Sequence, residues 1–264
     1  MNRAGIALAL LACVMAAPAR AVLTQRDLAS VALAPPPGAR VPLSLAVHDL
    51  DGRSASLGEA LAGRPALFIP VDVTCRTVCG PALSIAAAAL AQTGLRPAAD
   101  YRLIVWSFDA KDSADAARSM IAARMPEGPV ARAARVLQGD DAAASSLMTA
   151  IGYRAVYDTA SDQYAHPAGM LTLAGDGRVT RVLSSLALNA HDLRLALVEA
   201  GDGRVGTLGD RITLLCSQFD PARGIYSSAV SRVLMAAGAL TVALIAGALV
   251  ALLRRERLRR KGAA

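Results

Sequence analysis

Short apolar runs alternate with helix-like stretches through the middle of the chain. Residues 66–71 and 101–108 are apolar runs typical of strands that are buried on both faces. Residues 79–92 have a helical pattern, with Pro81 tolerated near the start and Gly94 just past the end. The same criteria predict further helices at 113–124, 142–151 and 190–199, and further strands at 134–137, 170–173 and 179–183.

The order of these elements indicates a fold class. Strands alternate with helices, which implies parallel strands joined by crossover helices. Residues 175–177 (Gly-Asp-Gly) separate the last two strands and predict a hairpin, so one edge of the sheet should be antiparallel. Asp51-Gly52 is an earlier turn signal. The sequence therefore predicts an α/β domain, a thioredoxin-like sandwich, at residues 43–200.

The first 21 residues have the features of a secretory signal peptide. Arg3 precedes an uncharged run that ends in Ala17-Pro18-Ala19. The run is too short to span a bilayer, which takes about 20 apolar residues. We assign residues 1–21 to a signal peptide and residues 22–42, which contain three consecutive prolines, to a linker.

A second membrane-directed segment lies near the C-terminus. Residues 233–253 carry no charge, and these 21 residues match the hydrocarbon core of a bilayer at the rise of a helix. We expect a juxtamembrane segment at 201–228 and a single transmembrane helix at 229–253. The arginine-rich tail at 254–264 should stay in the cytoplasm. The thioredoxin-like domain would then lie on the extracytoplasmic (periplasmic) face of the cell membrane.

The net charge of +7 does not indicate a nucleic-acid-binding protein. Residues 254–261 hold six basic residues and one glutamate, so most of the excess charge belongs to the tail that flanks the membrane. A surface that binds phosphates should carry its charge on the folded domain. We therefore expect no nucleic-acid partner.

Two cysteines carry the most evident chemistry. Cys75 and Cys79 follow the strand at 66–71 and stand where the helix at 79–92 begins. Sites in open α/β sheets form beyond the carboxyl ends of strands, and a helix N-terminus lowers the pKa of a thiol. The pair could form a disulfide outside the cytoplasm, or present two thiolates to a soft metal such as Cu(I). A purely structural disulfide is weakly motivated, because closing so short a loop contributes little entropy.

A metal site needs a third donor, and the exported domain offers three histidines. His48 and His191 stand in stretches that favour ordinary structural or surface roles. His166 precedes the strand at 170–173, in a loop that faces the cysteine loop in a thioredoxin-like arrangement. The bond before Pro167 is a candidate for the cis state.

Three segments resemble the Sco/SenC family of membrane-anchored, copper-handling proteins. Residues 68–81, FIPVDVTCRTVCGP, resemble its cysteine signature. Residues 105–109 (VWSFD), followed by Asp112, resemble its second strand and aspartate-containing loop. Residues 164–182 resemble its histidine-bearing segment, and the similarity spans roughly residues 41–199.

This resemblance implies a thioredoxin fold in which Cys75, Cys79 and His166 bind copper, as Cu(I), with Cu(II) left open. It also implies that the copper is delivered to a haem–copper (cytochrome c) oxidase during assembly, or that the cysteines of that oxidase are reduced. The implied partners are an oxidase subunit or another copper acceptor, a copper-donating protein and the membrane.

The chain departs from the family pattern at three points. Arg76 stands where the family has proline, Ala165 stands where it has aspartate, and the membrane helix is C-terminal rather than N-terminal. Losing the aspartate removes a group that could orient the imidazole of His166. Arg76 places a cation beside the thiols, which should lower their pKa and favour redox work.

Two functions remain open at this point. The first is a copper chaperone, which needs no catalytic turnover. The second is a thiol–disulfide oxidoreductase in which Cys75 attacks a partner disulfide and Cys79 resolves the mixed intermediate without a metal. His166 separates the two hypotheses, since thiol exchange needs no imidazole ligand. Cys216 is a further thiol, either unreactive, an additional soft ligand or a resolving thiol.

Overall fold

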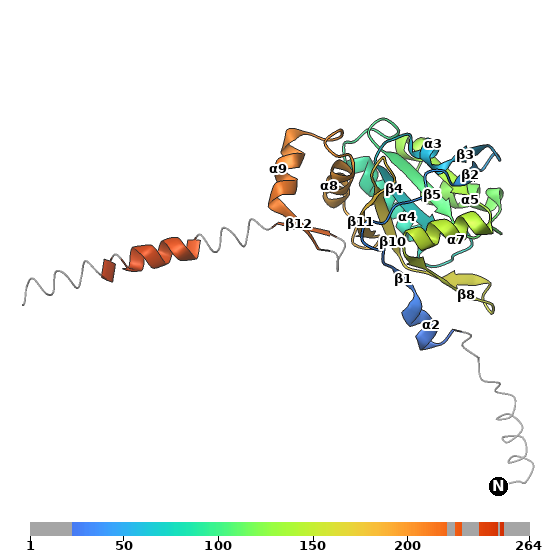
Figure 1. The fold of residues 1–264 in the computed structure, drawn as a ribbon, viewed down its shortest axis with the longest axis horizontal. Coiled ribbons are helices and arrows are strands. Elements are labelled where there is room, and N and C mark those ends of the chain that lie inside the picture. The colour runs from blue at the N-terminus through green and yellow to red at the C-terminus, as the bar shows by residue number, and fades with distance from the viewer. Residues whose placement is uncertain (1–22, 221–224, 229–237, 248, 251–264) are drawn as a thin grey trace, which may run out of the picture.

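A seven-stranded mixed sheet forms the centre of the protein (Figure 1). The computed structural model describes residues 23–220, 225–228, 238–247 and 249–250. The strands lie in the order β11-β10-β4-β5-β6-β2-β3, with β4, β5 and β6 parallel and the other neighbours antiparallel. Their bounds are β2 Ala46–Asp49, β3 Ser54–Ser56, β4 Ala66–Val71, β5 Arg102–Ser107, β6 Ala134–Gln138, β10 Gly169–Leu173 and β11 Val179–Ser184.

The parallel centre and the antiparallel pair of β10 and β11 confirm the thioredoxin-like α/β sandwich expected from the sequence. The opposite edge is antiparallel as well, because β2 and β3 form a hairpin and β2 pairs with β6. The sequence indicated the turn at Asp51-Gly52 but not these two strands. Both are short and only partly buried, so they lack the apolar pattern that marks a strand.

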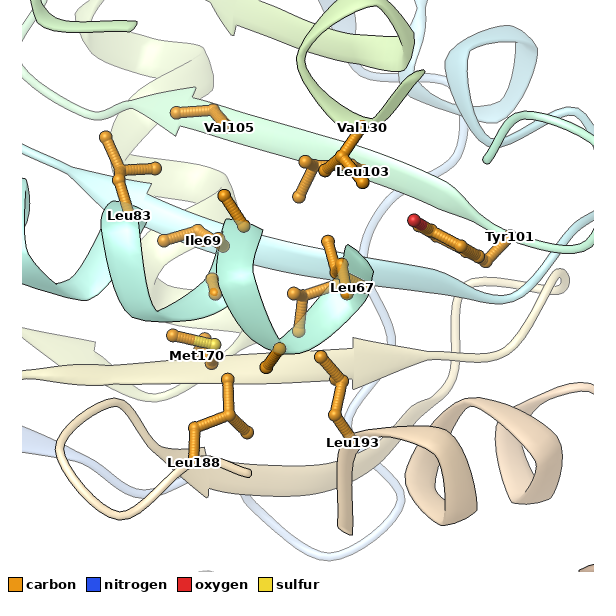
Figure 2. Close-up of a cluster of buried hydrophobic side chains, with 14 of the residues drawn as sticks. Leu67, Ile69, Leu83, Tyr101, Leu103, Val105, Val130, Met170, Leu188 and Leu193 are labelled. Carbon is orange, nitrogen blue, oxygen red and sulfur yellow. The ribbon is translucent and has the colours of Figure 1, made fainter. Parts of the chain in front are cut away.

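Helices cover both faces of the sheet. Helices α4, α5, α6 and α8 pack on one face, and α3 and α7 pack on the other. Their bounds are α3 Leu57–Leu61, α4 Cys79–Gln92, α5 Ala114–Arg124, α6 Pro129–Ala133, α7 Asp141–Ala150 and α8 Ala190–Ala200. Successive side chains of a strand point to opposite faces, so Leu67 and Ile69 of β4 enter the core under α4, whereas Phe68 enters the core beside α3. Figure 2 shows Leu67 and Ile69 packed with Leu83 of α4.

The residues expected to form a linker pack against the domain. They contain α2 (Gln25–Ser30) and β1 (Ala32–Leu33), and β1 pairs with β7 (Tyr153–Arg154). The backbone before β7 approaches this segment very closely, since a Cβ on Gly152 would lie 2.0 Å from the carbonyl oxygen of Ala34. Gly152 also has a φ of +63°, which favours glycine. Glycine at this position therefore lets the N-terminal segment join the folded body.

The expected juxtamembrane segment folds against the domain too. It forms α9 (Leu208–Cys216) and a hairpin of β12 (Ser217–Asp220) and β13 (Ile225–Ser228). Arg194 of α8 and Asp210 of α9 form an ion pair, with 2.7 Å between Nε and Oδ1. The hydrogen bonds that Asp210 accepts from Arg194 hold the pKa of this carboxyl below its usual range. This pair holds α9 against α8.

Three predicted features lie wholly or partly outside the described residues: the signal peptide (1–21), the transmembrane helix (229–253) and the cytoplasmic tail (254–264). Residues 238–247, within the predicted transmembrane helix, are described and helical. None of the helices that the structure describes is long and apolar enough to cross a bilayer.

Replacing Gly152 with alanine should weaken the docking of the N-terminal segment. Gly52→Ala is a matched control, because Gly52 has a φ of +77° but a Cβ there would meet nothing within 4 Å. The control measures the backbone strain alone, about 1–2 kcal/mol. Gly152→Ala should lower the free energy of unfolding by at least about 1 kcal/mol more, as expected for overpacking. Urea denaturation measures both losses, and equal losses would contradict the role of the close approach to Ala34.

Candidate metal centre

The candidate site lies at the edge of the sheet where the parallel strands β4, β5 and β6 end. The loop after β4 contains Cys75 and leads into α4, whose first residue is Cys79. Strand β10 pairs antiparallel with β4, so its N-terminal end lies at the same edge. His166 stands just before β10, between that strand and the hairpin of β8 (Val156–Asp158) and β9 (Gln163–Ala165). The fold thus brings two distant loops together.

Cys75, Cys79 and His166 meet at this edge. Nε2 of His166 lies 3.2 Å from Sγ of Cys79 and 3.4 Å from Sγ of Cys75. The three donor atoms all lie within 4.8 Å of one another, and the described residues contain no second group of this kind. Neither cysteine forms a disulfide. The structure therefore places the three side chains that the sequence singled out in one cluster.

The two cysteines differ in exposure. Cys79 is only 3% exposed, and its sulfur accepts a hydrogen bond from the backbone N–H of Asp72, with 3.4 Å between N and Sγ. Cys75 is half-buried, and its sulfur lies 3.5 Å from the hydroxyl of Thr77. Cys75 is therefore the sulfur that an approaching molecule reaches first.

The imidazole of His166 is oriented by its other nitrogen. Nδ1 lies 3.3 Å from the carbonyl oxygen of Pro167, and because a carbonyl only accepts, Nδ1 is the donor. This contact turns Nε2 toward the sulfurs. The rings of Phe108 and Tyr153 also pack near the imidazole, with centroid distances of 5.7 and 6.5 Å. The bond before Pro167 is trans, the more stable isomer, so the cis state suggested for it is wrong.

Hydrogen bonds shift the pKa values of the two cysteines in opposite directions. The thiol of Cys79 donates to Cys75, and with further hydrogen bonds from His166 and Thr77 this lowers the pKa of Cys75 to about 2. The pKa of Cys79 is raised, because it donates to Cys75 and is buried. Burial alone would lower the pKa of His166, but its bonds to Cys75 and to the Pro167 carbonyl raise it. The metal-free site therefore holds one thiolate, one thiol and a histidine that keeps its proton more tightly than usual.

Asp112 supports the base of the cysteine loop. Its Oδ2 accepts hydrogen bonds from the backbone N–H of Val73 at 3.0 Å and from the hydroxyl of Ser107 at 2.6 Å. The side chain of Gln138 donates to the Asp112 carbonyl oxygen at 2.9 Å. Burial raises the pKa of Asp112. The sequence pointed to Asp112, and to the segment that contains Ser107, only through a family resemblance. No motif marks Gln138, which lies at the end of β6.

The other residues considered from the sequence lie elsewhere or on the surface. His48 lies in β2, and His191 is exposed in the first turn of α8. Arg76 lies in the cysteine loop with its side chain exposed to solvent. Cys216 ends α9, and its side chain lies outside the described residues.

Two sulfurs and one imidazole nitrogen form a soft set of donors. Thiolates select Cu(I) over hard cations such as Mg²⁺ and Ca²⁺. Three protein donors also leave one side of a bound ion open to a ligand from another molecule. The same two cysteines can alternatively join in a disulfide, so the cluster is suited to metal binding and to thiol exchange.

Solved structures of similar fold include Sco/SenC proteins. A protein from Aquifex aeolicus that is named for electron transfer aligns with a TM-score of 0.56 at 20% identity, over 65% of this chain and 97% of its own. A SCO1/SenC family lipoprotein from Bacillus anthracis aligns with a TM-score of 0.53 at 15% identity, over 64% and 99%. BsSco, a member of the Sco family of cytochrome c oxidase assembly proteins, aligns with a TM-score of 0.52 at 20% identity, over 63% and 96%. No family model and no curated protein matches the chain.

The chain therefore has the thioredoxin-like α/β fold of Sco/SenC proteins, and the resemblance inferred from its sequence is confirmed at the level of the fold. At identities of 15–20%, this similarity describes the backbone.

The ionisation of the cysteine pair can be measured by alkylation. Because the pKa of Cys75 is lowered to about 2, its thiolate should persist from neutral pH into the acid range. Iodoacetamide should modify Cys75 at pH 5 nearly as fast as at pH 8, whereas an ordinary thiol, with a pKa of about 8.5, slows about tenfold per pH unit across most of that interval. Cys79 should stay unmodified, because it is buried and its pKa is raised.

Peptide mass spectrometry of the reduced, metal-free protein distinguishes the two thiols, and Cys13→Ser together with Cys216→Ser removes the other cysteines of the sequence. His166→Ala removes one hydrogen bond to the thiolate, so it should move the profile of Cys75 to higher pH. A wild-type rate that climbs tenfold per unit from pH 5 to pH 8 would contradict the thiolate assignment.

Proposed function

We propose that this protein binds copper through Cys75, Cys79 and His166 and passes it to another protein. The observation that carries the proposal is the approach of one imidazole nitrogen, Nε2 of His166, to both sulfurs at 3.2 and 3.4 Å. A dithiol that served exchange alone would need no nitrogen donor facing it. Copper is thus the cargo of the site.

Cu(I) is the oxidation state that this donor set suits best, because two of its three donors are soft sulfurs. His166 adds a nitrogen donor that also suits Cu(II), which is the second state we consider. When the ion binds, the thiol of Cys79 and Nε2 of His166 both lose their protons, so copper and protons compete for the site. The phenyl ring of Phe108 and the phenol ring of Tyr153 cover the imidazole and keep bulk water from that side.

Transfer would proceed by ligand exchange at the exposed sulfur. A thiolate of the acceptor forms a bond to Cu(I), and the bond from Cu(I) to Cys75 breaks, so Cys75 leaves as a thiolate. Exchange at the half-buried Cys75 precedes exchange at Cys79, which is 3% exposed and part of the hydrophobic core. The oxidation state of copper does not change in these steps.

We propose further that the acceptor is a subunit of a haem–copper oxidase during assembly, or another copper protein near the membrane. Support comes from the sequence resemblance and from the fold shared with BsSco, which belongs to a family of cytochrome c oxidase assembly proteins. A separate protein would supply the copper. In a companion role, Cys75 and Cys79 would be oxidised to a disulfide while a disulfide of the acceptor is reduced to two thiols.

A metal-free thiol–disulfide oxidoreductase is the second candidate function. It is favoured by the asymmetry of the pair, since Cys75 is accessible with a lowered pKa and Cys79 is buried with a raised one. Cys75 would attack a substrate disulfide, and Cys79 would release the product by attacking the mixed disulfide. In this function His166 only stabilises the thiolate.

We propose that the thioredoxin-like domain at 43–200 works outside the cytoplasm and is anchored by a C-terminal helix at 229–253. Support comes from the sequence, in which residues 1–21 have signal-peptide features and the uncharged stretch at 233–253 precedes a basic tail. The anchor would restrict acceptors to proteins at or near the membrane.

Titration of the full-length protein with Cu(I) against a competing chelator tests the copper proposal. We expect one ion per chain, and losses of more than about 100-fold in affinity for Cys75→Ser, Cys79→Ser and His166→Ala, since even partners outside the ligand shell contribute about 10- to 100-fold. His191→Ala is the matched control, because His191 is exposed at the start of α8. If His166→Ala bound Cu(I) as tightly as this control, the oxidoreductase would become the leading candidate.

Reporter fusions test the proposed topology. A reporter that works only in the cytoplasm should be active after Ala264, and one that works only outside it should be active when inserted in the exposed turn at Gly52. The basic tail of six Lys and Arg residues predicts this orientation. Activity of the first reporter outside the cytoplasm would overturn it.

A further inference from the structure

Asp72 joins two segments that are far apart in the sequence. It follows β4 and is fully buried, with 0% exposure. Its Oδ1 accepts two hydrogen bonds from Thr74, from the backbone N–H at 2.8 Å and from the hydroxyl at 2.7 Å. Its Oδ2 accepts a hydrogen bond from the backbone N–H of Tyr164 at 3.2 Å. One carboxylate thus connects the cysteine loop with the strand that leads to the histidine.

Both segments carry candidate ligands. Thr74 immediately precedes Cys75, and Tyr164 stands two residues before His166. The backbone N–H of Asp72 also donates to the sulfur of Cys79. Asp72 therefore has a hydrogen bond to Cys79 itself and to residues close in sequence to the other two candidate ligands, Cys75 and His166.

The chemistry of this contact requires a carboxylate. Burying a charged group is costly unless hydrogen bonds compensate, and three donors face the two oxygens of Asp72. A carboxylate only accepts, whereas the side-chain nitrogen of an asparagine would turn its own N–H toward another N–H. The residue before His166 is Ala165, so the histidine segment has no acidic residue directly beside its imidazole.

We propose that Asp72 is a positioning residue, which ties the cysteine loop to the histidine segment and preforms the cluster before any metal binds. The metal-binding consequence rests on the proposed function, whereas the tie between the two segments does not. Ser185 holds the segment on the other side of His166, because its hydroxyl donates to the carbonyl oxygen of Ala168 at 2.8 Å. Loss of Asp72 should therefore loosen the histidine segment without detaching it from the sheet.

Hydrogen exchange of the full-length, metal-free protein in detergent micelles tests the tie directly. In Asp72→Ala, the peptides that contain Thr74 and Tyr164 should both exchange faster, by about tenfold for each lost hydrogen bond. In Asp72→Asn, whose side chain has nearly the same shape as that of aspartate, at least one of these two peptides should exchange faster than in the wild-type protein. Asp112→Asn is the matched control, since Asp112 is also a buried carboxylate at this edge but bonds to Val73 and Ser107.

The outcomes of this experiment are distinct. A folded Asp72→Ala protein whose Tyr164 peptide exchanges at the wild-type rate overturns the proposal. Equal acceleration of that peptide by Asp112→Asn also overturns it, because the effect would then be a general loosening of the edge. If Asp72→Ala does not fold, Asp72→Asn decides, and wild-type exchange of both peptides in that variant is the contrary result.

Copper affinity provides the second measurement. Asp72→Asn should weaken Cu(I) binding by about 10- to 100-fold, as expected for a partner outside the ligand shell. If Asp72 acts partly through His166, the same substitution should cost less in a His166→Ala background. Equal losses in both backgrounds would contradict that coupling. A wild-type protein that binds no Cu(I) would refute the proposed function and leave the exchange experiment to decide the role of Asp72.

Discussion

The antiparallel pairing of β10 with β4 determines which side chains can meet in this protein. Strand β4 runs toward the edge where the cysteine loop begins, and β10 starts from that edge, with Leu171 opposite Phe68. This register brings Nε2 of His166 within 3.4 Å of Sγ of Cys75, although the two residues are 91 positions apart. A slip of one residue would turn the buried side chains of β10 to the other face, so the hydrophobic core and the site depend on the same pairing.

The core also sets the difference between the two sulfurs. Cys79 opens α4 and belongs to the cluster of buried side chains between that helix and the sheet. Cys75 lies one helical turn earlier, in the loop, and keeps partial access to solvent. One sulfur is thereby fixed by packing, while the other can exchange partners. Both transfer of a soft ion and attack on a disulfide need such an arrangement.

Much of this fold follows from patterns that the sequence displays openly. The apolar runs of β4 and β5 and the helix that begins at Cys79 are local features, and the structure contains them as expected. The hairpin of β2 and β3 was not predicted, because its strands are short and partly polar. The docking of the N-terminal segment depends on the space that Gly152 leaves for Ala34, and no local pattern reveals such a contact between distant residues.

Some residues of the candidate site could likewise be predicted from the sequence, and others could not. Residue type and position in the predicted fold pointed to Cys75, Cys79 and His166, and the resemblance to Sco/SenC proteins implied that they bind copper. The roles of Asp72 and Asp112 could not be predicted, because carboxylates are common and these two act on backbone N–H groups. The sequence suggested that Arg76 would lower the pKa of the thiols. Its side chain is instead exposed to solvent, and the hydrogen bond from Cys79 is the largest cause of the lowered pKa of Cys75.

X-ray absorption spectroscopy of the Cu(I)-loaded protein tests the central claim most directly, because it counts the sulfur and nitrogen atoms around the metal. The account predicts one copper bound by two sulfurs and one imidazole nitrogen, supplied by Cys75, Cys79 and His166 of a single chain. A spectrum with sulfur ligands alone, unchanged by His166→Ala, would contradict it.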